Sequence, residues 1–371
     1  MTPDVQVFLY PEELEATPAH ALAEQILELG CDAASVAVVY HRARRVLPRQ
    51  GRVSVLTTAT TYFEPERSRY GELAPVGNGA AGLRERLFEF RAACGRAGLG
   101  FRAWLVPLHH DALAAAFPDA AARALDGSPN GVGLCPSKAA SVELVAALVA
   151  DVCAQLEPEL VELEAALYPA WEPSYTMTLS LAPLSPEARL LGAQCFCEAC
   201  RDLLGGDAGE LERRARVSAG APFGAGPWDE ELERALGAAR ARGVETLVRA
   251  ATESAHAGGS ALRVFGSGPP QQAALQGLAG SGPADRLLLG CGPLEGDELL
   301  ERFRALRAVA GGRAATASIN WSQERGMAAD AERLGAAGAD GLALYNLSLV
   351  PAEGLVAFRE AAAAFRSAVA A

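Results

Sequence analysis

Lysine is almost missing from this sequence. Of its 33 basic residues, Lys138 is the one lysine and the remainder are arginine. A Schiff-base mechanism and a Walker A phosphate loop both need a lysine, and Lys138 does not follow a glycine-rich loop. Pyridoxal phosphate chemistry and P-loop ATP hydrolysis are therefore unexpected. The Gly-x-Ser-x-Gly motif of serine hydrolases is also absent.

Positive charge is scarce relative to negative charge. The chain has 33 Lys and Arg against 45 Asp and Glu, for a net charge of −12. Nucleic acids and anionic membranes require clustered positive charge, so we expect neither as a partner. No apolar run approaches the ~20 residues of a membrane span. The start, Met1-Thr-Pro-Asp-Val, lacks the basic and apolar segments of a signal peptide. We expect a soluble, cytoplasmic protein.

What the sequence has is a regular alternation of short apolar runs and longer helical segments. Half of its 371 residues are apolar, enough for a large core. Eight such units predict a (β/α)8 TIM barrel formed as one domain over residues 1–371, because near-continuous apolar runs are typical of parallel strands buried on both faces. An open, doubly wound sheet is the alternative, but no Gly-x-Gly-x-x-Gly follows the first run. The runs are Val5–Tyr10, Ser35–Tyr40, Phe101–Leu108, Leu160–Leu167, Ala261–Ser267, Arg286–Cys291, Ala315–Asn320 and Gly341–Leu347.

Two segments interrupt the repeat. Residues Arg52–Thr58 and Thr61–Phe63 form an extended excursion after the second predicted strand. A long insertion, residues 168–260, separates the fourth and fifth strands and contains a cysteine cluster. Insertions that follow barrel strands lie over the carboxyl-terminal face, where the active sites of such barrels form.

Three of the eight cysteines stand together, as Cys195-Phe-Cys197-Glu-Ala-Cys200. Closely spaced thiolates on a turn that leads into a helix supply three ligands of a tetrahedral Zn²⁺ site. The best candidate for the fourth is Cys135, which precedes another predicted helix. Such a site has no open position, so the zinc would be structural and would join the insertion to the preceding loop. The alternative is a set of buried, metal-free thiols.

The sequence Cys135-Pro-Ser, followed later by Cys-x-Cys-x-x-Cys-Arg, resembles the zinc motif of the β-galactosidases of glycoside hydrolase family 42. It also resembles a set of glycosidase-like barrel proteins that carry Cys-Phe-Cys-x-x-Cys after a Leu-Ser/Gly-Pro stretch, here residues 184–192. The resemblance extends over most of the chain in strand order, with specific motifs only within about 130–205. It implies a barrel, zinc bound by the same four cysteines, and a homo-oligomer.

The same resemblance has one clear departure. In the β-galactosidases, an Asn-Glu pair at the end of the fourth strand supplies the acid/base. Here no Asn-Glu stands near that point, and the chain reads Tyr168-Pro-Ala-Trp-Glu-Pro-Ser-Tyr175 instead. The departure leaves the fold expectation intact and weakens the expectation of glycoside hydrolysis.

Two glutamates on the fourth strand are the leading catalytic candidates. Side chains alternate along a strand, so Glu162 and Glu164 both point into the barrel. Glu164 lies nearer the mouth and is the expected general acid or base, assisted by Glu162, because burial and like charge raise a carboxyl pKa. The alternative is a structural pair with Arg263, which also points inward.

Other polar and aromatic residues follow the strands. The third strand ends Leu108-His109-His110, and an adjacent pair points in different directions, so one histidine is expected in the pocket. We take His109 as the catalytic candidate. Aromatic rings and fixed polar groups together are typical of sugar sites. The expected substrate-binding residues are Tyr10, Tyr40, His41, His110, Trp171, Asn320, Trp321, Tyr345 and Asn346.

The sequence therefore predicts a glycosidase-like enzyme that acts on a carbohydrate or a glycosylated small molecule. Glycosidases normally use two carboxylates, and no second one has a strong claim. The positions considered are Glu64, Glu66, Glu295 and Glu324. A sugar lyase or isomerase, with His109 or His110 as partner of Glu164, is the first alternative. A non-catalytic binding protein on a hydrolase scaffold is the second.

Overall fold

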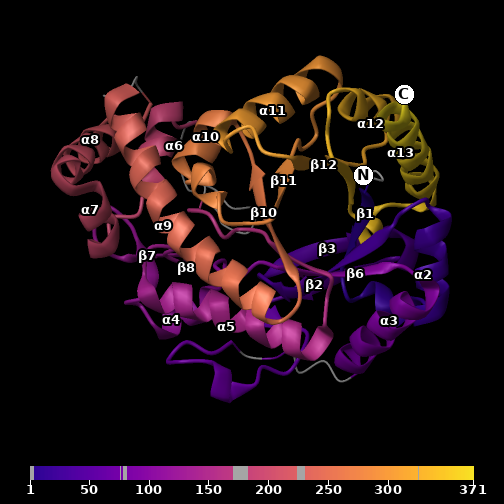
Figure 1. Cartoon of the computed structure of the whole chain (residues 1–371). Coiled ribbons are helices and arrows are strands. Elements are labelled where there is room, and N and C mark those ends of the chain that lie inside the picture. Colours follow the sequence, from indigo (N-terminus) through magenta and orange to yellow (C-terminus); the bar gives the residue numbers. More distant parts are fainter. Residues whose placement is uncertain (1–3, 76, 78–81, 170–182, 224–229, 325) are drawn as a thin grey trace.

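Eight parallel strands close into a barrel in the computed structural model, which describes residues 4–75, 77, 82–169, 183–223, 230–324 and 326–371 (Figure 1). Each strand pairs with the next one in the repeat, and the last pairs with the first. The predicted (β/α)8 barrel is confirmed, and all eight predicted strands are present. The barrel strands are β1 (Asp4–Leu9), β2 (Ala33–Tyr40), β6 (Gly100–Leu105), β9 (Leu160–Leu163), β10 (Ala261–Ser267), β11 (Arg286–Gly290), β12 (Ala315–Asn320) and β13 (Gly341–Tyr345).

Helices surround this barrel, and each barrel strand is followed by at least one of them (Figure 1). In chain order the outer helices are α2 (Ala19–Glu28), α3 (Leu83–Ala97), α5 (Ala139–Leu156), α9 (Glu230–Ala257), α10 (Pro270–Leu275), α11 (Gly296–Val309), α12 (Met327–Ala336) and α13 (Ala352–Ala370). Short elements decorate the loops: α1 (Glu13–Ala16), β3 (Ala43–Leu47), β4 (Arg52–Leu56), β5 (Thr60–Thr61), α4 (Asp111–Ala116), β7 (Ala121–Arg123) and β8 (Pro129–Leu134).

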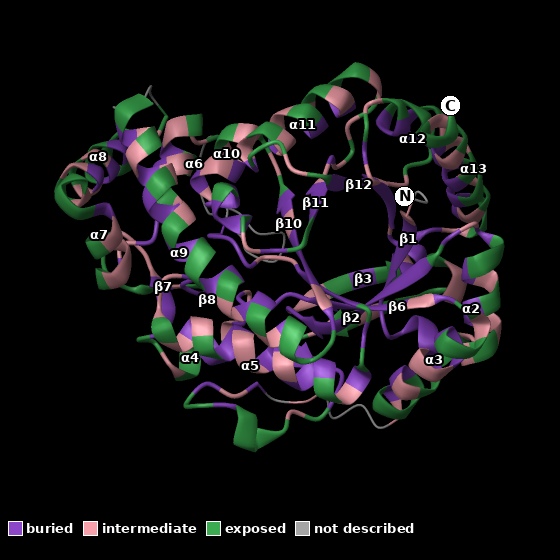
Figure 2. Cartoon of the chain, viewed as in Figure 1, coloured by how far each residue is buried: buried purple, intermediate pink, exposed green. Residues whose placement is uncertain are grey.

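The strands are apolar because both of their faces are covered. All eight residues of β2 are buried, and Figure 2 shows the purple, buried strands inside a ring of helices with green outer faces. Helix α5 is long and apolar enough, by length and composition alone, to cross a membrane. Half of it is buried in the fold, where it packs against α9, and core helices meet the same criteria.

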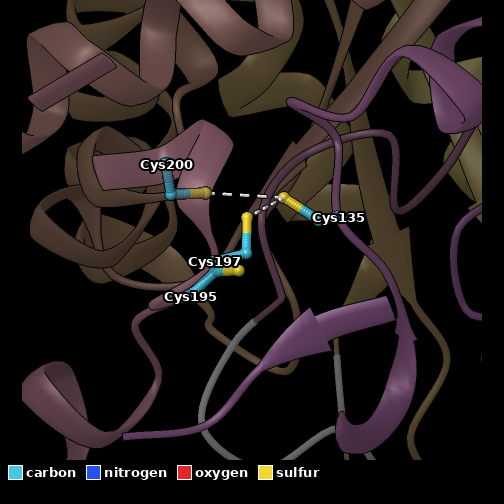
Figure 3. Close-up of side chains that lie close together, drawn as sticks. All are labelled: Cys135, Cys195, Cys197 and Cys200. Carbon is cyan, nitrogen blue, oxygen red and sulfur yellow. Dashed lines mark hydrogen bonds between the residues drawn. The ribbon is translucent and has the colours of Figure 1, made fainter. Parts of the chain in front are cut away.

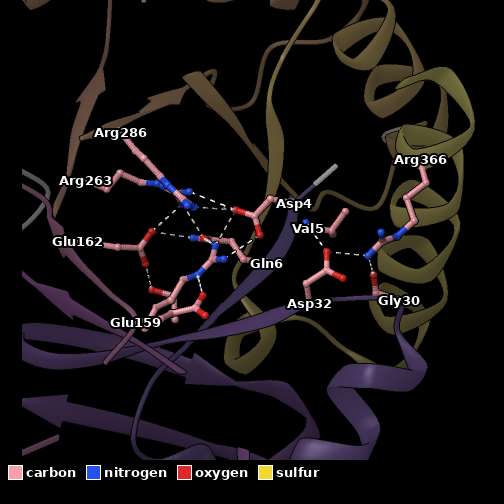
Figure 4. Close-up of polar contacts among 12 residues, drawn as sticks. Asp4, Val5, Gln6, Gly30, Asp32, Glu159, Glu162, Arg263, Arg286 and Arg366 are labelled. Atoms are coloured by element: carbon pink, nitrogen blue, oxygen red, sulfur yellow. Dashed lines mark hydrogen bonds and ion pairs between the residues drawn. The ribbon is translucent and has the colours of Figure 1, made fainter. Parts of the chain in front are cut away.

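A layer of charged side chains fills the amino-terminal end of the barrel (Figure 4). Glu162 is fully buried and accepts hydrogen bonds from Gln6 and Arg263, both at 2.9 Å, and from Ser35. Asp4 pairs with Arg263 at 3.3 Å and with a second buried arginine of this layer. Since a buried carboxylate requires such partners, Glu162 is accounted for as a structural group.

Removing one partner from this layer is expected to destabilise the protein strongly. Arg263→Met leaves Glu162 buried without its guanidinium, and we expect a loss of about 3–5 kcal/mol in unfolding free energy. Urea denaturation of the variant, monitored by circular dichroism, measures this loss. Adding Glu162→Gln to the variant is expected to restore part of the stability. A fully stable Arg263→Met protein would show that the ion pair contributes nothing.

The predicted excursion after β2 is a hairpin, β3 and β4, followed by β5, which pairs antiparallel with β2. Its Arg45 is buried, pairs with Glu12 at 2.5 Å and lies over the rings of Tyr10 and Tyr40, at 4.0 and 4.6 Å from their centres. The hairpin therefore covers these two tyrosines at the barrel mouth.

The long insertion adds three short helices, α6 (Pro186–Gly192), α7 (Glu198–Leu204) and α8 (Ala208–Gly220), which lie beside α9 and away from the barrel axis (Figure 1). They enclose a small hydrophobic cluster with the amino-terminal half of α9, including Leu211 and Leu236. The rest of α9 packs on the barrel against α5. The insertion thus combines extra helices with the normal helix of the fourth unit.

Candidate functional site

A cavity of about 470 Å³ opens at the carboxyl-terminal ends of the barrel strands. Inward-facing Phe8, Phe265 and Leu288 line its apolar part. Its polar lining comes from strand ends and from helices outside the barrel. These polar residues are His41, His109, Glu164, Tyr168, Ser267, Gln272, Gln276, Arg302, Ser318, Asn320 and Tyr345.

Glu164 occupies the position expected of it, directly after β9 and in the cavity wall. The indole Nε1–H of Trp104 donates a hydrogen bond to its Oε2 at 2.7 Å. Burial raises the pKa of Glu164 from 4.5 to about 7, and the Trp104 hydrogen bond lowers it only in part. A carboxyl group with a pKa near neutrality is able to give and take a proton at physiological pH.

This raised pKa has a consequence for stability that does not depend on activity. The unfolded chain holds Glu164 near its ordinary pKa of 4.5, whereas the folded pKa is about 7. The folded state therefore binds the extra proton, and its stability falls as pH rises from about 4.5 through 7. We expect Glu164→Gln to be more stable than the wild type at pH 8 by about 3 kcal/mol, with the difference vanishing near pH 4. Denaturant titrations at both pH values measure it, and an unchanged difference between them contradicts the assignment.

Two histidines line the same cavity as neutral groups. The Nδ1–H of His41 donates to the carbonyl oxygen of Arg42 at 2.7 Å, and burial lowers its pKa to about 4. Burial, with a smaller contribution from His41, lowers the pKa of His109 to about 3. Their ring centres lie 5.9 Å apart. At neutral pH both rings are thus uncharged, in the cavity that Glu164 also lines.

Tyr345 brings a hydrogen-bonded set of tyrosines to the cavity wall. Its hydroxyl lies 2.8 Å from that of Tyr10, which lies 3.0 Å from that of Tyr40. Burial raises the pKa of all three, so all remain protonated. Tyr345 lines the cavity, whereas the other two stand behind it, under Arg45 of the hairpin. Tyr10 and Tyr40 therefore support the site and do not line it.

Other predicted site residues lie away from the cavity. Glu162 belongs to the buried charged layer, where Arg263 pairs with it. The ring of His110 caps helix α4 by accepting the Leu113 N–H at 3.3 Å. The Asn346 side chain accepts the Ser348 N–H at 2.9 Å, and neither it nor Trp321 lines the cavity. Trp171 lies outside the described residues. These placements correspond to structural roles for Glu162, His110 and Asn346.

Several lining residues were not predicted. Ser267 points inward at the end of β10, and the alternation of that strand was a usable signal. Gln272 on α10, the nearby Gln276 and Arg302 on α11 come from elements outside the barrel. No strand pattern points to them, because only tertiary packing brings those elements to the cavity.

Within the described part of the chain, Glu164 is the one carboxylate that lines the cavity. Of the four other glutamates considered from the sequence, Glu64, Glu295 and Glu324 are exposed. Glu66 is exposed too, and it pairs with Arg69 at 2.6 Å. None of the four belongs to the cavity wall.

The four predicted metal ligands come together (Figure 3). Their Sγ atoms all lie within 4.8 Å of one another, with Cys135 at 3.4 Å from Cys200 and 3.7 Å from Cys197. A tetrahedral Zn²⁺ with Zn–S bonds of about 2.3 Å places its sulfurs about 3.8 Å apart. None of the four cysteines forms a disulfide. The donor set and its spacing fit one soft divalent ion.

The cysteine cluster has two structural connections. It joins the loop before α5, through Cys135, to the start of α7 in the insertion, as the sequence predicts. It also reaches the cavity: the hydroxyl of Tyr168 lies 3.6 Å from Cys200 Sγ and contacts Ser137, while Tyr168 itself lines the cavity. The cavity wall and the cluster thus share a side chain.

No protein-family model matches this sequence, and no curated protein matches it. Solved structures do match over nearly the whole chain. The glycoside hydrolase domain of PgaB (BpsB) from Bordetella bronchiseptica superposes with a TM-score of 0.60 at 12% identity, covering 99% of this chain and 98% of that one. The chain has the barrel fold of a glycoside hydrolase.

Two larger enzymes show the same fold. A β-galactosidase from Bacillus circulans sp. alkalophilus matches with a TM-score of 0.58 at 11% identity, covering 99% of this chain and 56% of that one. An α-L-fucosidase from Paenibacillus thiaminolyticus gives 0.57 at 11% identity, with 97% and 49% coverage. This chain therefore spans about half the length of these two proteins. At such identities the likeness concerns the fold, and the resemblance to family 42 stays a resemblance.

Proposed function

We propose that the protein is a glycosidase-like enzyme that acts on a carbohydrate or a glycosylated small molecule, with Glu164 as its acid/base. One observation carries the proposal: Glu164 lines the cavity at the mouth of the barrel with a pKa of about 7. The solved glycoside hydrolases that resemble this chain share the barrel architecture, in which the carboxyl-terminal ends of the strands lie at the mouth. The four-cysteine cluster is proposed to hold a structural Zn²⁺.

In this mechanism, protonated Glu164 gives its proton to the glycosidic oxygen as the bond from that oxygen to the sugar breaks. The carboxylate then takes a proton from the water that completes hydrolysis. Neutral His41 and His109, with Tyr345 and Asn320, line the cavity, and in this proposal they hydrogen-bond sugar hydroxyls. Phe265 offers apolar surface for the C–H face of a ring.

A second candidate is proton abstraction from a sugar, as in a lyase or isomerase. What favours it is that Glu164 and His109 line one cavity, while no second carboxylate does so among the described residues. The two reactions leave different products. Hydrolysis incorporates solvent oxygen, whereas proton abstraction exchanges a carbon-bound hydrogen with solvent deuterium.

The test is turnover on a panel of aryl and natural-product glycosides in ¹⁸O- and deuterium-labelled water. Release of aglycone with ¹⁸O in the sugar supports hydrolysis, and the anomeric form of the product tells whether a second carboxylate acts as nucleophile or as base. Deuterium on a sugar carbon supports the lyase or isomerase. Binding without turnover of any panel member would favour the non-catalytic alternative.

A further inference from the structure

Arg302 is a cation in the cavity wall. It lies on α11, half-buried, and lines the same cavity as Glu164. In the described part of the chain, no hydrogen bond or ion pair engages its guanidinium.

An acidic neighbour is available to Arg302 and is not used. Glu298 stands four residues earlier on the same helix, which is the favourable order for a helical ion pair. Elsewhere, the same spacing gives pairs between Glu245 and Arg249 at 2.5 Å and between Glu212 and Arg216 at 2.8 Å. Arg302 instead faces the cavity and leaves Glu298 exposed.

The charge balance of the cavity favours an anionic occupant. Among the described lining residues, Arg302 is the one permanent cation and Glu164 the one acid. His41 and His109 are neutral at pH 7, and Glu164 is partly protonated there. The described lining thus carries a formal charge between zero and +1, in a chain with a net charge of −12. Uncompensated positive charge in a concave site attracts anions.

The surroundings of Arg302 extend this character. Gln272 and Gln276, which carry amide donors, line the cavity and also form a wall of a neighbouring cavity of about 400 Å³. Arg189 and Arg240 line that second cavity, and none of its described lining residues is acidic. Arg189, Arg240, Gln272 and Arg302 lie on α6, α9, α10 and α11, respectively, and none of them lies on β9, which precedes Glu164.

We propose that Arg302, with Gln272 and Gln276, binds an anionic group on the sugar, so that the ligand is a saccharide bearing a carboxylate, phosphate or sulfate. A guanidinium matches these groups because its planar fork donates two parallel hydrogen bonds. The proposal rests on the proposed function for the saccharide part of the ligand. The negative charge of the proposed ligand is inferred from Arg302 and the cavity lining alone.

The test is equilibrium binding by calorimetry with matched pairs of small probes. Methyl glucuronides and galacturonides are compared with the corresponding glucosides and galactosides, and glucose 6-phosphate and 6-sulfate with glucose, in each anomeric form. We expect at least one anionic probe to bind about tenfold or more tightly than its neutral partner. Arg302→Gln is expected to remove that preference, and Arg302→Lys to keep part of it. Arg304→Gln, an exposed arginine on the same helix, is the matched control and should change nothing.

The results separate this inference from the proposed function. Preference for an anionic probe that is lost in Arg302→Gln supports the anion site, whether or not any probe is turned over. Turnover of neutral glycosides with no anionic preference keeps the glycosidase and overturns the anion site. The anion site is also overturned if no anionic probe binds more tightly than its neutral partner, or if Arg304→Gln removes the preference equally.

Discussion

Glu164→Gln is expected to lower kcat on any glycoside substrate by about 10²–10⁴-fold, with a much smaller change in KM. The amide keeps the shape of the side chain and an oxygen that accepts the Trp104 hydrogen bond, but it has no acidic proton to give. Steady-state kinetics of the purified variant measure the loss. Glu295→Gln, an exposed glutamate outside the cavity, is the control and should retain full activity. A Glu164→Gln enzyme with wild-type kcat would exclude this residue as the acid/base.

The pH profile gives the same assignment a second test. A general acid must be protonated, so wild-type activity should fall as pH rises through the Glu164 pKa of about 7. The Trp104 N–H stabilises the carboxylate and lowers this pKa, so Trp104→Phe should move the alkaline limb to higher pH. The position of the limb is the readout, because the smaller ring also lowers overall stability. A limb that stays in place in Trp104→Phe would mean that another group titrates.

The second large effect concerns the metal. Purified protein is expected to contain about one Zn²⁺ per chain by elemental analysis, and Cys197→Ser is expected to lose it. A structural zinc contributes binding energy directly to folding, so the variant should lose several kcal/mol of stability. Cys94→Ser changes a buried free thiol on α3 and is the control, with metal content unchanged. Metal-free wild-type protein that is fully stable would contradict the zinc site.

The structure also changes what metal loss should do to the cavity. From the sequence, the zinc site joins the insertion to the preceding loop. In the structure, Tyr168 lines the cavity while its hydroxyl lies 3.6 Å from Cys200 Sγ. Loss of the metal is therefore expected to raise KM as well as to destabilise the protein. Tyr168→Phe keeps all four thiols and removes the hydroxyl that lies near Cys200 Sγ. This variant should retain zinc and show a smaller change in KM than the metal-free protein.

The predicted zinc ligands and Glu164 show which features can be predicted from a short stretch of sequence. Three cysteines within six residues lie close together in any compact conformation, and Cys135 precedes a helix of the adjacent unit. The position of Glu164 follows from alternation in β9, since the end of a barrel strand and the direction of its side chains are both properties of consecutive residues. Both features depend on short stretches of sequence.

The placements of Glu162 and Tyr10 show what alternation does not decide. Glu162 points inward as predicted, but its depth in the barrel, beside Gln6 and Arg263, makes it a member of an ion-pair layer. Tyr10 directly follows β1, yet Arg45 from the hairpin lies over its ring and Tyr10 does not line the cavity. In each case the partner is distant in the chain, so the sequence pattern around the residue does not predict the contact.

The eight-strand barrel, the cysteine cluster and the strand-end position of Glu164 could thus be predicted from local sequence, because strand periodicity and ligand spacing depend on neighbouring residues. Tertiary packing alone decided which polar groups share the cavity. Gln272 and Arg302 line it from helices outside the barrel. Arg45 of the hairpin lies over the ring of Tyr40, which does not line the cavity, and the His110 ring caps α4. The physical reason is that a cavity is formed by the surfaces of elements far apart in the chain, and their relative placement depends on the packing of the whole core.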